Sequence, residues 1–287
     1  MNDRPAFNPE QFKSATRQAW DNAAAGWNEQ TPRVRAWLAD ATDAMLNLAQ
    51  VRPGARVLDV SAGAGDQTLD IARRVGPNGY VLATDISPAI LKIARANARA
   101  AGFTNVETRV ADSETLGLEE ASFDAAVCRL GLMFCPDPLK ALREIHRALK
   151  PAGRACTLVF SEPQKNPCIG ILVSTAVKHA GVPPMDPYQP GGLLSLGKPG
   201  LIDELFAKAG FSQVESTRVS APFRLGSAKD YVDFIRTSAT PILQLLGKLE
   251  PAQRDAAWAD IEDKLKVFQK DTGWEGPNEL LLTVGSR

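Results

Sequence analysis

The sequence lacks the features that mark several large classes of protein. No segment approaches the roughly 20 uncharged apolar residues that a membrane-spanning helix needs, and the first residues, Met1 to Pro5, carry no apolar signal stretch. We therefore predict a cytoplasmic protein with no membrane partner. The 33 Lys and Arg residues balance the 33 Asp and Glu residues and form no basic run. A general nucleic-acid binder is not expected, because such a protein needs an excess of positive charge.

Histidine and cysteine are also scarce. The chain has two histidines, His146 and His179, so few imidazole bases are available. Its four cysteines form no CxxC pair and have no histidine at metal-ligand spacing, so we expect reduced thiols and no metal. They are Cys128, Cys135, Cys156 and Cys168.

The 287 residues suffice for one large α/β domain or for one domain with an appended subdomain. Short apolar runs alternate with amphipathic helical patterns from about residue 54 to 160. This rhythm predicts a mainly parallel sheet with helices on both faces, a Rossmann-like fold whose ligands bind at the carboxyl ends of the strands. The predicted strands are 57–60, 80–84, 106–110, 123–128 and 154–160.

The remainder departs from this rhythm. Residues 161–200 are rich in proline and glycine and contain a helical piece at 169–179, which predicts an inserted cap over the strand ends. Residues 201–287 are expected to complete the sheet with strands at 213–223 and 279–284, and to add substrate-side helices, two of them between 228 and 269. We thus divide the chain into an N-terminal helical segment (1–50), a cofactor-binding core (51–160), the cap insertion (161–200) and the C-terminal part (201–287).

A glycine loop, Ser61 to Gly65, follows the first predicted strand and precedes a helix. Such a loop can be a plain tight turn, or it can cradle a ligand at the helix N-terminus. Asp59 ends the strand and Asp66 opens the helix, and both would repel a pyrophosphate. A ligand with positive groups and no phosphate suits the loop better. S-adenosylmethionine is such a ligand, so the loop favours it over a nicotinamide dinucleotide.

Two further acids end the next two strands. Asp85 follows the second strand, where a carboxylate can accept hydrogen bonds from both ribose hydroxyls. Asp112, followed by Ser113, comes after the third strand and could accept from an adenine amino group. Ser87 already supplies the helix cap, so Asp85 is not needed for that purpose. Three acids at three successive strand ends predict an adenosine-containing cofactor.

Five segments resemble the successive motifs of class I S-adenosylmethionine-dependent methyltransferases, and most of all the branch of ubiquinone and menaquinone biosynthesis C-methyltransferases. These are Val57–Gly65, Ala83–Ser87, Ala111–Ser113, Ser122–Val127 and Leu149–Arg154. The resemblance implies a seven-stranded sheet whose last strand is antiparallel. It also implies that the N-terminal region around Trp20 and Trp27 closes over the cofactor as a lid, with Trp27 beside the methionine part or the substrate.

The resemblance also assigns cofactor contacts. The methionine part is expected to face Asp59, Ser61, Ala62, Gly63 and Gly65, the ribose Asp85 and Ile86, and the adenine Asp112 and Ser113. Arg129, directly after the fourth strand, either binds the methionine carboxylate or an acidic substrate, or pairs with a local acid. The candidate substrate contacts are Trp27, Met133, Phe134, Met185 and Tyr188.

Two departures from the motifs bear on the chemistry. Ser61 stands where relatives usually have the first glycine, and Met133 and Phe134 stand where many relatives carry histidines. The obvious base is thereby replaced by an apolar wall. His179, at the end of the cap helix, is the one candidate catalytic residue, whereas His146 lies on a helix away from the strand ends.

Methyl transfer from a sulfonium is a displacement on an activated carbon, so positioning in a dry site supplies much of the acceleration. We predict methyl transfer to a small apolar or aromatic acceptor, with oxygen slightly favoured over carbon, nitrogen or sulfur. A cofactor-binding regulatory module and a nucleotide-dependent oxidoreductase are the alternatives. An arsenite methyltransferase is disfavoured because the cysteines fall in strands and flanking loops. The oligomeric state stays open.

Overall fold

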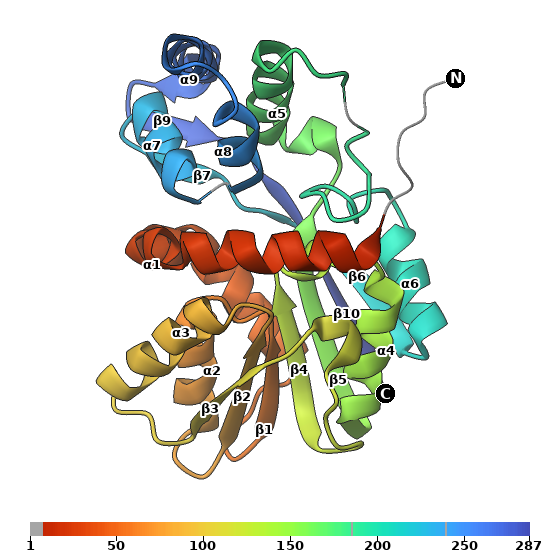
Figure 1. The fold of residues 1–287 in the computed structure, drawn as a ribbon. Coiled ribbons are helices and arrows are strands. Elements are labelled where there is room, and N and C mark those ends of the chain that lie inside the picture. Colours follow the sequence, from red (N-terminus) through yellow and green to blue (C-terminus); the bar gives the residue numbers. More distant parts are fainter. Residues whose placement is uncertain (1–7, 185, 239) are drawn as a thin grey trace.

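The computed structural model describes residues 8–184, 186–238 and 240–287, and a seven-stranded sheet lies at its centre (Figure 1). The strand order is β3-β2-β1-β4-β5-β10-β6, with the first five parallel and β10 antiparallel to both neighbours. The predicted Rossmann-like sheet with an antiparallel last strand is confirmed. The strands are β1 (Arg56–Val60), β2 (Tyr80–Asp85), β3 (Val106–Val110), β4 (Phe123–Arg129), β5 (Leu149–Phe160), β6 (Ser212–Ser220) and β10 (Glu279–Ser286).

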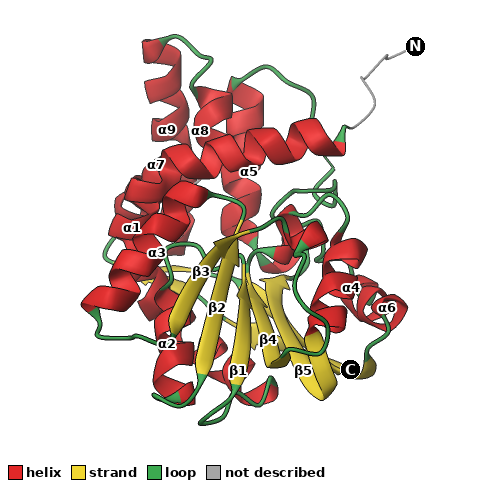
Figure 2. Ribbon diagram, turned by 60° about the horizontal axis from the view of Figure 1, so that its bottom comes forward, coloured by secondary structure: helices red, strands yellow, loops and turns green. Residues whose placement is uncertain are grey.

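Helices cover both faces of this sheet (Figure 2). Helices α2 (Asp66–Val75) and α3 (Pro88–Ala100) pack against each other and against α1, while α4 (Pro138–Ala148) packs against α6 (Leu201–Ala209). Local sequence explains α3 well. Ser87 accepts a hydrogen bond from the backbone of Ile90, and proline occupies the first helical position, so the helix begins where the sequence predicts.

Helix α1 (Pro9–Leu48) is 40 residues long and crosses the carboxyl ends of the strands (Figure 1). It begins at Asn8, whose side chain accepts from the backbone of Gln11. Pro32 lies inside it and removes one backbone donor from the helical ladder. Among the described helices, none is long and apolar enough to cross a membrane.

A second group of elements, the upper layer, lies on the other side of α1 from the main sheet (Figure 1). It contains a three-stranded sheet of order β7-β9-β8. Its elements are α5 (Pro167–His179), β7 (Phe223–Leu225), α7 (Ala228–Ser238), α8 (Thr240–Leu246), α9 (Pro251–Leu265), β8 (Gln269–Lys270) and β9 (Gly273–Gly276).

Two predictions for this region are wrong in detail. The single strand expected at 213–223 is two strands in different sheets, because the chain leaves β6 at Ala221 and Pro222, and Pro222 has no N–H for a ladder. The described part of region 228–269 holds three α-helices, α7, α8 and α9, instead of the two predicted. Helix α8 is followed by Gly247, and proline opens α9 at Pro251.

Candidate cofactor site

The glycine loop lies between β1 and α2 at the carboxyl ends of the strands. Gly63 and Gly65 have positive φ angles of +57° and +86°, which glycine adopts without steric cost. A β-carbon on Gly65 would lie 3.0 Å from the β-carbon of Ala94, so this glycine allows the loop to pack on α3. Gly65 also caps α2 without a side-chain hydrogen bond. The first N–H groups of α2 are therefore left for other acceptors.

Asp59 is fully buried below this loop. Its carboxylate accepts a hydrogen bond from Thr68 Oγ1 at 2.6 Å and another from Gln67 Nε2. Burial raises the pKa of Asp59 to about 7, although the hydrogen bonds from Thr68 and Gln67 oppose this shift. Asp59, predicted to contact the cofactor, is thus bound by two side chains of α2.

Gln67 provides a test of whether a cationic ligand fits here. Its Oε1 atom is buried and has no hydrogen-bond partner within the described part of the chain. Buried polar atoms are normally paired, so the site has an acceptor in need of a donor, next to the Asp59 carboxylate. An ammonium group such as that of S-adenosylmethionine offers the missing N–H together with a positive charge. The residues present therefore fit the methionine part of that molecule.

Arg129 forms a nearly buried ion pair. Its Nη2 lies 2.5 Å from Asp66 Oδ2, and its Nη1 donates to Thr42 Oγ1 on α1 at 2.9 Å. The side chains of Arg129 and Asp66 are 7% and 5% exposed. Of the two roles that the sequence leaves open, the structure shows the local ion pair. This pair joins the end of β4 to the start of α2.

Asp85 ends β2 and holds the loop in place. Its Oδ2 accepts from the backbone N–H of Gly63 and its Oδ1 from that of Ser87, both at 3.0 Å. Burial raises the pKa of Asp85, against the effect of the backbone hydrogen bonds from Ser87 and Gly63. The neighbouring Ile86 is half-buried. Ala62, 3% exposed, ties the loop to β2 by donating its N–H to the Thr84 carbonyl at 2.9 Å.

Asp112 follows β3 and is bound on both oxygens. Its Oδ1 accepts from the backbone of Glu114 at 2.9 Å, and its Oδ2 lies 2.8 Å from the ammonium of Lys13. Lys13 also lies 2.6 Å from Glu114 Oε2. The hydroxyl of Ser113 contacts Cys135 Sγ at 3.1 Å. Lys13 and Glu114 were not predicted as part of the site.

The N-terminal half of α1 lies directly over the loop. Ala24 packs with Ala64 and Ile90, and the indole nitrogen of Trp27 lies 3.5 Å from the place of a β-carbon on Gly63. Trp20 lies edge-on to Trp27, with ring centroids 5.4 Å apart. These contacts place the N-terminal half of α1 against the glycine loop; its role as a closing lid, which the resemblance implies, stays a prediction.

The candidate substrate residues are only partly brought together. Phe134 is half-buried and its ring lies 5.9 Å from that of Trp20, which links it to Trp27. Met133 is 1% exposed and packs in the core, and its carbonyl accepts from Ser195 Oγ at 2.8 Å. Tyr188 is half-buried in the loop after α5. Met185 lies outside the described residues.

Both histidines have structural partners. Nε2 of His179 lies 2.9 Å from Asp260 Oδ2, which joins α5 to α9. Figure 1 shows α5 running away from the strand ends, and His179 is its last residue. His146 packs edge-on against Phe211 beside α6, and burial lowers its pKa. The catalytic role of His179 stays a prediction, since its contacts include no residue of the glycine loop.

The four cysteines are free and buried. Burial raises the pKa of Cys128, Cys156 and Cys168 to about 12, so these thiols stay protonated at neutral pH. Within the described residues, no group of three or more metal-ligating side chains forms a metal site.

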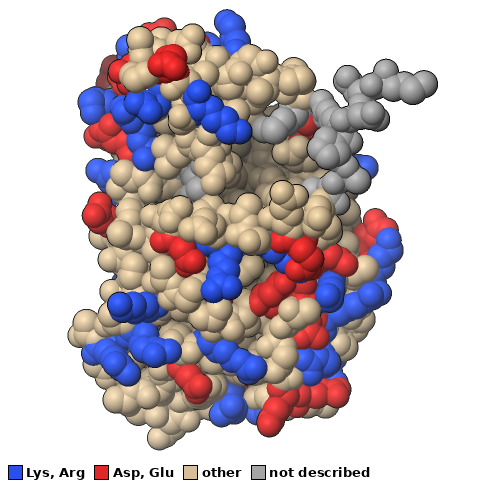
Figure 3. All heavy atoms as spheres, in the orientation of Figure 1, with Lys and Arg blue, Asp and Glu red and all other residues tan. Residues whose placement is uncertain are grey.

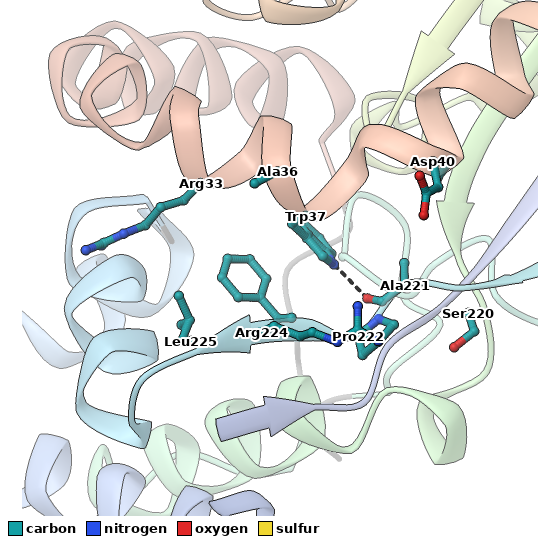
Figure 4. Close-up of a pocket in the computed structure, with 11 residues that line it drawn as sticks. Arg33, Ala36, Trp37, Asp40, Ser220, Ala221, Pro222, Arg224 and Leu225 are labelled. Carbon is teal, nitrogen blue, oxygen red and sulfur yellow. Dashed lines mark hydrogen bonds between the residues drawn. The ribbon is translucent and has the colours of Figure 1, made fainter. Parts of the chain in front are cut away.

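A cavity of about 230 Å³ lies between α1 and the β6–β7 corner (Figure 4). Trp37 crosses it and donates its indole N–H to the Ala221 carbonyl at 2.6 Å. Arg33 and Arg224 line it as well, and no residue of the glycine loop does. This cavity was not predicted, because its walls come from segments far apart in the chain, such as those of Trp37 and Ala221.

Comparison with known proteins agrees with the motifs. Residues 35–171 match the model of the ubiE/COQ5 methyltransferase family. Over 122 residues the chain is 40% identical to the ubiquinone/menaquinone biosynthesis C-methyltransferase UbiE of Teredinibacter turnerae, a match that covers 42% of this chain and 49% of that protein. The chain thus spans about half the length of the curated relatives it matches. The predicted resemblance is confirmed for this stretch.

Solved structures show the same fold over more of the chain. The YcgJ protein of Bacillus subtilis aligns with a TM-score of 0.59 and 20% identity, over 87% of this chain and 98% of that one. Phosphoethanolamine N-methyltransferase 2 of Haemonchus contortus, solved with S-adenosyl-L-methionine, aligns with a TM-score of 0.54 and 18% identity, over 86% of this chain and 52% of that one. At these identities the likeness concerns the fold.

Proposed function

We propose that this chain, whose residues 35–171 match the ubiE/COQ5 methyltransferase family, is an S-adenosylmethionine-dependent methyltransferase acting on a small apolar or aromatic acceptor. One observation carries the proposal. Asp59, Asp85 and Asp112 end the three neighbouring strands β1, β2 and β3, around a glycine loop that opens α2. This arrangement suits a cationic adenosine derivative, for the reasons of charge given above.

Each part of the cofactor has a set of residues to hold it. Gln67 and Asp59 would bind the ammonium through the unpaired Oε1 and the adjacent carboxylate. Asp85 would accept from the ribose hydroxyls, and Asp112 from the adenine amino group. When bound, S-adenosylmethionine supplies a methyl group already activated by its sulfonium. The residues of the chain contribute binding and orientation.

Aromatic side chains complete the site. Trp20, Trp27 and Phe134 form a connected group beside the glycine loop, and they would exclude water and align a flat acceptor. In-line displacement gains mainly from such positioning. In the view of Figure 3 the surface is hollowed between α1 and the upper layer.

The acceptor atom is the finer part of the proposal. The sequence slightly favoured an oxygen, whereas the curated relatives are named as C-methyltransferases of quinone biosynthesis. On that ground we propose transfer to a carbon of a quinol-like acceptor ahead of transfer to an oxygen. We also propose a division of the chain into an N-terminal helical lid (1–50), a cofactor-binding core (51–160), a cap insertion (161–200) and a C-terminal part (201–287). We further propose a cytoplasmic location and a small-molecule substrate.

The test is methyl transfer from S-adenosylmethionine with a labelled methyl group. Quinols, catechols and simple phenols are offered in turn, and the labelled product is located by mass spectrometry. A quinol product that carries the labelled methyl group on carbon supports the full proposal. A product that carries it on oxygen supports methyltransferase activity but reverses the preferred acceptor atom. No transfer to any acceptor, together with binding of the cofactor, would instead support the regulatory module.

A further inference from the structure

Asp59 and Arg129 lie on the same face of the main sheet, on the neighbouring strands β1 and β4. Asp59 is paired with Val127 in the parallel register, and Arg129 follows Val127 by two residues. Because successive side chains of a strand point to opposite faces, Val127 and Arg129 share the face of Asp59. The charge of Arg129 is close enough to act on the Asp59 carboxylate. A cation at the end of β4 thus accompanies the carboxylate that would bind the ammonium of the cofactor.

Asp66 and Thr42 hold the guanidinium of Arg129 in place. Nη2 lies 2.5 Å from Asp66 Oδ2, and Nη1 donates to Thr42 Oγ1 at 2.9 Å. Asp66 is the first residue of α2, and the next two residues of that helix are the ones that donate to Asp59. The ion pair therefore anchors the turn of α2 whose side chains bind Asp59.

Burial makes the ionisation of Asp59 sensitive to the two charges of this ion pair. Asp59 is 0% exposed, and burial raises its pKa to about 7. Hydrogen bonds from α2 and the charge of Arg129 lower this pKa, whereas the charge of Asp66 raises it. The side chains of Arg129 and Asp66 are themselves nearly buried. Charges act more strongly on one another in such a place than they do in water.

The other elements packed around Asp59 and its neighbours contribute uncharged groups. Cys128, also on β4, interacts with Asp59, but burial raises the pKa of its thiol to about 12, so it carries no charge at neutral pH. Ala83 of β2 is the partner of Asp59 in the ladder, and Thr42 is the contact from α1. Among the described residues, the charges whose removal should shift the ionisation of Asp59 are therefore those of the ion pair.

We propose that Arg129 is a positioning residue for the cofactor, which favours the ionised form of Asp59 and so prepares it to bind the ammonium of S-adenosylmethionine, while Asp66 holds the guanidinium and limits its effect. The inference rests on the proposed function, because it takes Asp59 as the partner of the ammonium. The ionised carboxylate attracts the ammonium more strongly than the neutral acid does. Affinity for the cofactor should therefore fall at pH values below the pKa of Asp59.

The two members of the ion pair have opposite effects on Asp59, which separates an electrostatic role from a structural one. Arg129→Met removes the positive charge and leaves Asp66, so Asp59 should take up its proton at a higher pH. Asp66→Asn removes the negative charge and leaves the cation unopposed, so Asp59 should take up its proton at a lower pH. Both variants break the same ion pair, so a purely structural effect would have the same sign in both.

The experiment measures binding of S-adenosylhomocysteine, which carries the same ammonium group, by isothermal titration calorimetry from about pH 5 to 9, on either side of the pKa of Asp59. The readout is the pH at which the association constant is half of its plateau value. Arg35→Met is the matched control, because it breaks an exposed ion pair between α1 and α2. Methylthioadenosine, which lacks the ammonium, is the control ligand. Circular dichroism confirms that each protein is folded at each pH.

We expect the half-plateau pH to be about 7 in the wild type. It should be about 1 pH unit higher in Arg129→Met and about 1 pH unit lower in Asp66→Asn, at the lower end of the shifts that a neighbouring charge causes. Arg35→Met should match the wild type. Methylthioadenosine should bind without this dependence on pH. Because the two expected shifts have opposite signs, Asp66→Asn decides alone if Arg129→Met does not fold.

Several results would overturn the positioning role while leaving cofactor binding intact. These are a flat profile in the wild type, an unchanged value in either folded variant, shifts of the same sign in both variants, and an equal pH dependence with methylthioadenosine. If the wild type binds S-adenosylhomocysteine at no pH, the proposed function falls and the role of Arg129 falls with it.

Discussion

A β-carbon placed on Gly131 would lie 2.3 Å from the β-carbon of Ser61 and 2.6 Å from its hydroxyl. Ser61 opens the glycine loop with a φ of +56°, a conformation that costs a residue with a side chain about 1–2 kcal/mol. Relatives usually have a glycine at the position of Ser61. In this chain the side chain of Ser61 fills the space beside Gly131, which has none. Ser61 and Gly131 thus form a size-matched pair.

Gly131→Ala should lower the free energy of unfolding by about 1–3 kcal/mol through overpacking. Ser61→Gly should relieve both the strained φ and the overlap, so the double variant should lose much less than Gly131→Ala alone. Chemical denaturation of the four proteins gives the coupling energy. Strictly additive effects would show that the two positions do not contact each other.

The buried ion pair of Arg129 should be costly to break. Arg129→Met leaves Asp66 as an uncompensated buried charge, and we expect a loss of about 3–5 kcal/mol in unfolding free energy. Arg35 pairs with Asp70 on the surface, with 44% of the Arg35 side chain exposed. Arg35→Met should therefore cost about 0–1 kcal/mol. Equal losses from the two variants would contradict the burial argument.

Asp59 should make stability depend on pH. Its pKa is about 7 when folded and its ordinary value is 3.8. Between these values the folded protein keeps a proton that the unfolded chain has lost, so the contribution of Asp59 to unfolding free energy falls as pH rises from about 4 to 7. Asp59→Asn cannot ionise and should show a flatter profile.

The measurement is urea denaturation of wild type and Asp59→Asn at half-unit steps of pH. The difference between the two profiles isolates Asp59, since the other titrating groups are common to both proteins. Parallel profiles from pH 4 to 7 would mean that Asp59 ionises normally in the folded state.

The loop after α5 rests on the first turn of α1. A β-carbon on Gly191, whose φ is +77°, would lie 2.2 Å from the ring of Phe12. Gly181 has a similar φ of +65° and no atom within 4 Å of such a β-carbon. Gly191→Ala and Gly181→Ala therefore share the conformational strain, and only the former meets a neighbour.

We expect Gly191→Ala to cost about 1–3 kcal/mol more than Gly181→Ala, as overpacking does elsewhere. It should also speed amide exchange in the first turn of α1, because Phe12 must move. Thermal unfolding and hydrogen exchange measure the two effects. Identical behaviour of the two alanine variants would show that the loop does not rest on Phe12.

The parts of the fold with strong local signals were predictable. The runs of β1 and β2, the Ser87-Pro88 start of α3 and the positions of the strand-end acids follow from periodicity and capping alone. The antiparallel β10 followed from the resemblance. The small sheet was missed because its strands are two to four residues long and carry no period.

The side-chain contacts of the candidate site were harder to predict from the sequence than the fold. Lys13 lies 99 positions before Asp112, and nothing in the pattern of a long amphipathic helix distinguishes it from the neighbouring Arg17. From the sequence, Arg129 could equally bind a ligand carboxylate or pair with a nearby acid. Its contact with Asp66 in the structure shows the second role. Long-range side-chain pairing of this kind depends on how elements pack, which a single sequence does not encode locally.

The central claim is that the strand-end acids bind an adenosine-containing cofactor, and Asp85→Ala tests it most directly. The control is Asp124→Ala, since Asp124 also accepts from a backbone N–H but lies at the opposite end of the sheet, near the start of β4. Titration calorimetry with S-adenosylhomocysteine should show binding to wild type and Asp124→Ala and a loss of at least about tenfold for Asp85→Ala, as expected for hydrogen bonds to a charged group. Equal affinity of all three proteins, or binding by none, would contradict the account.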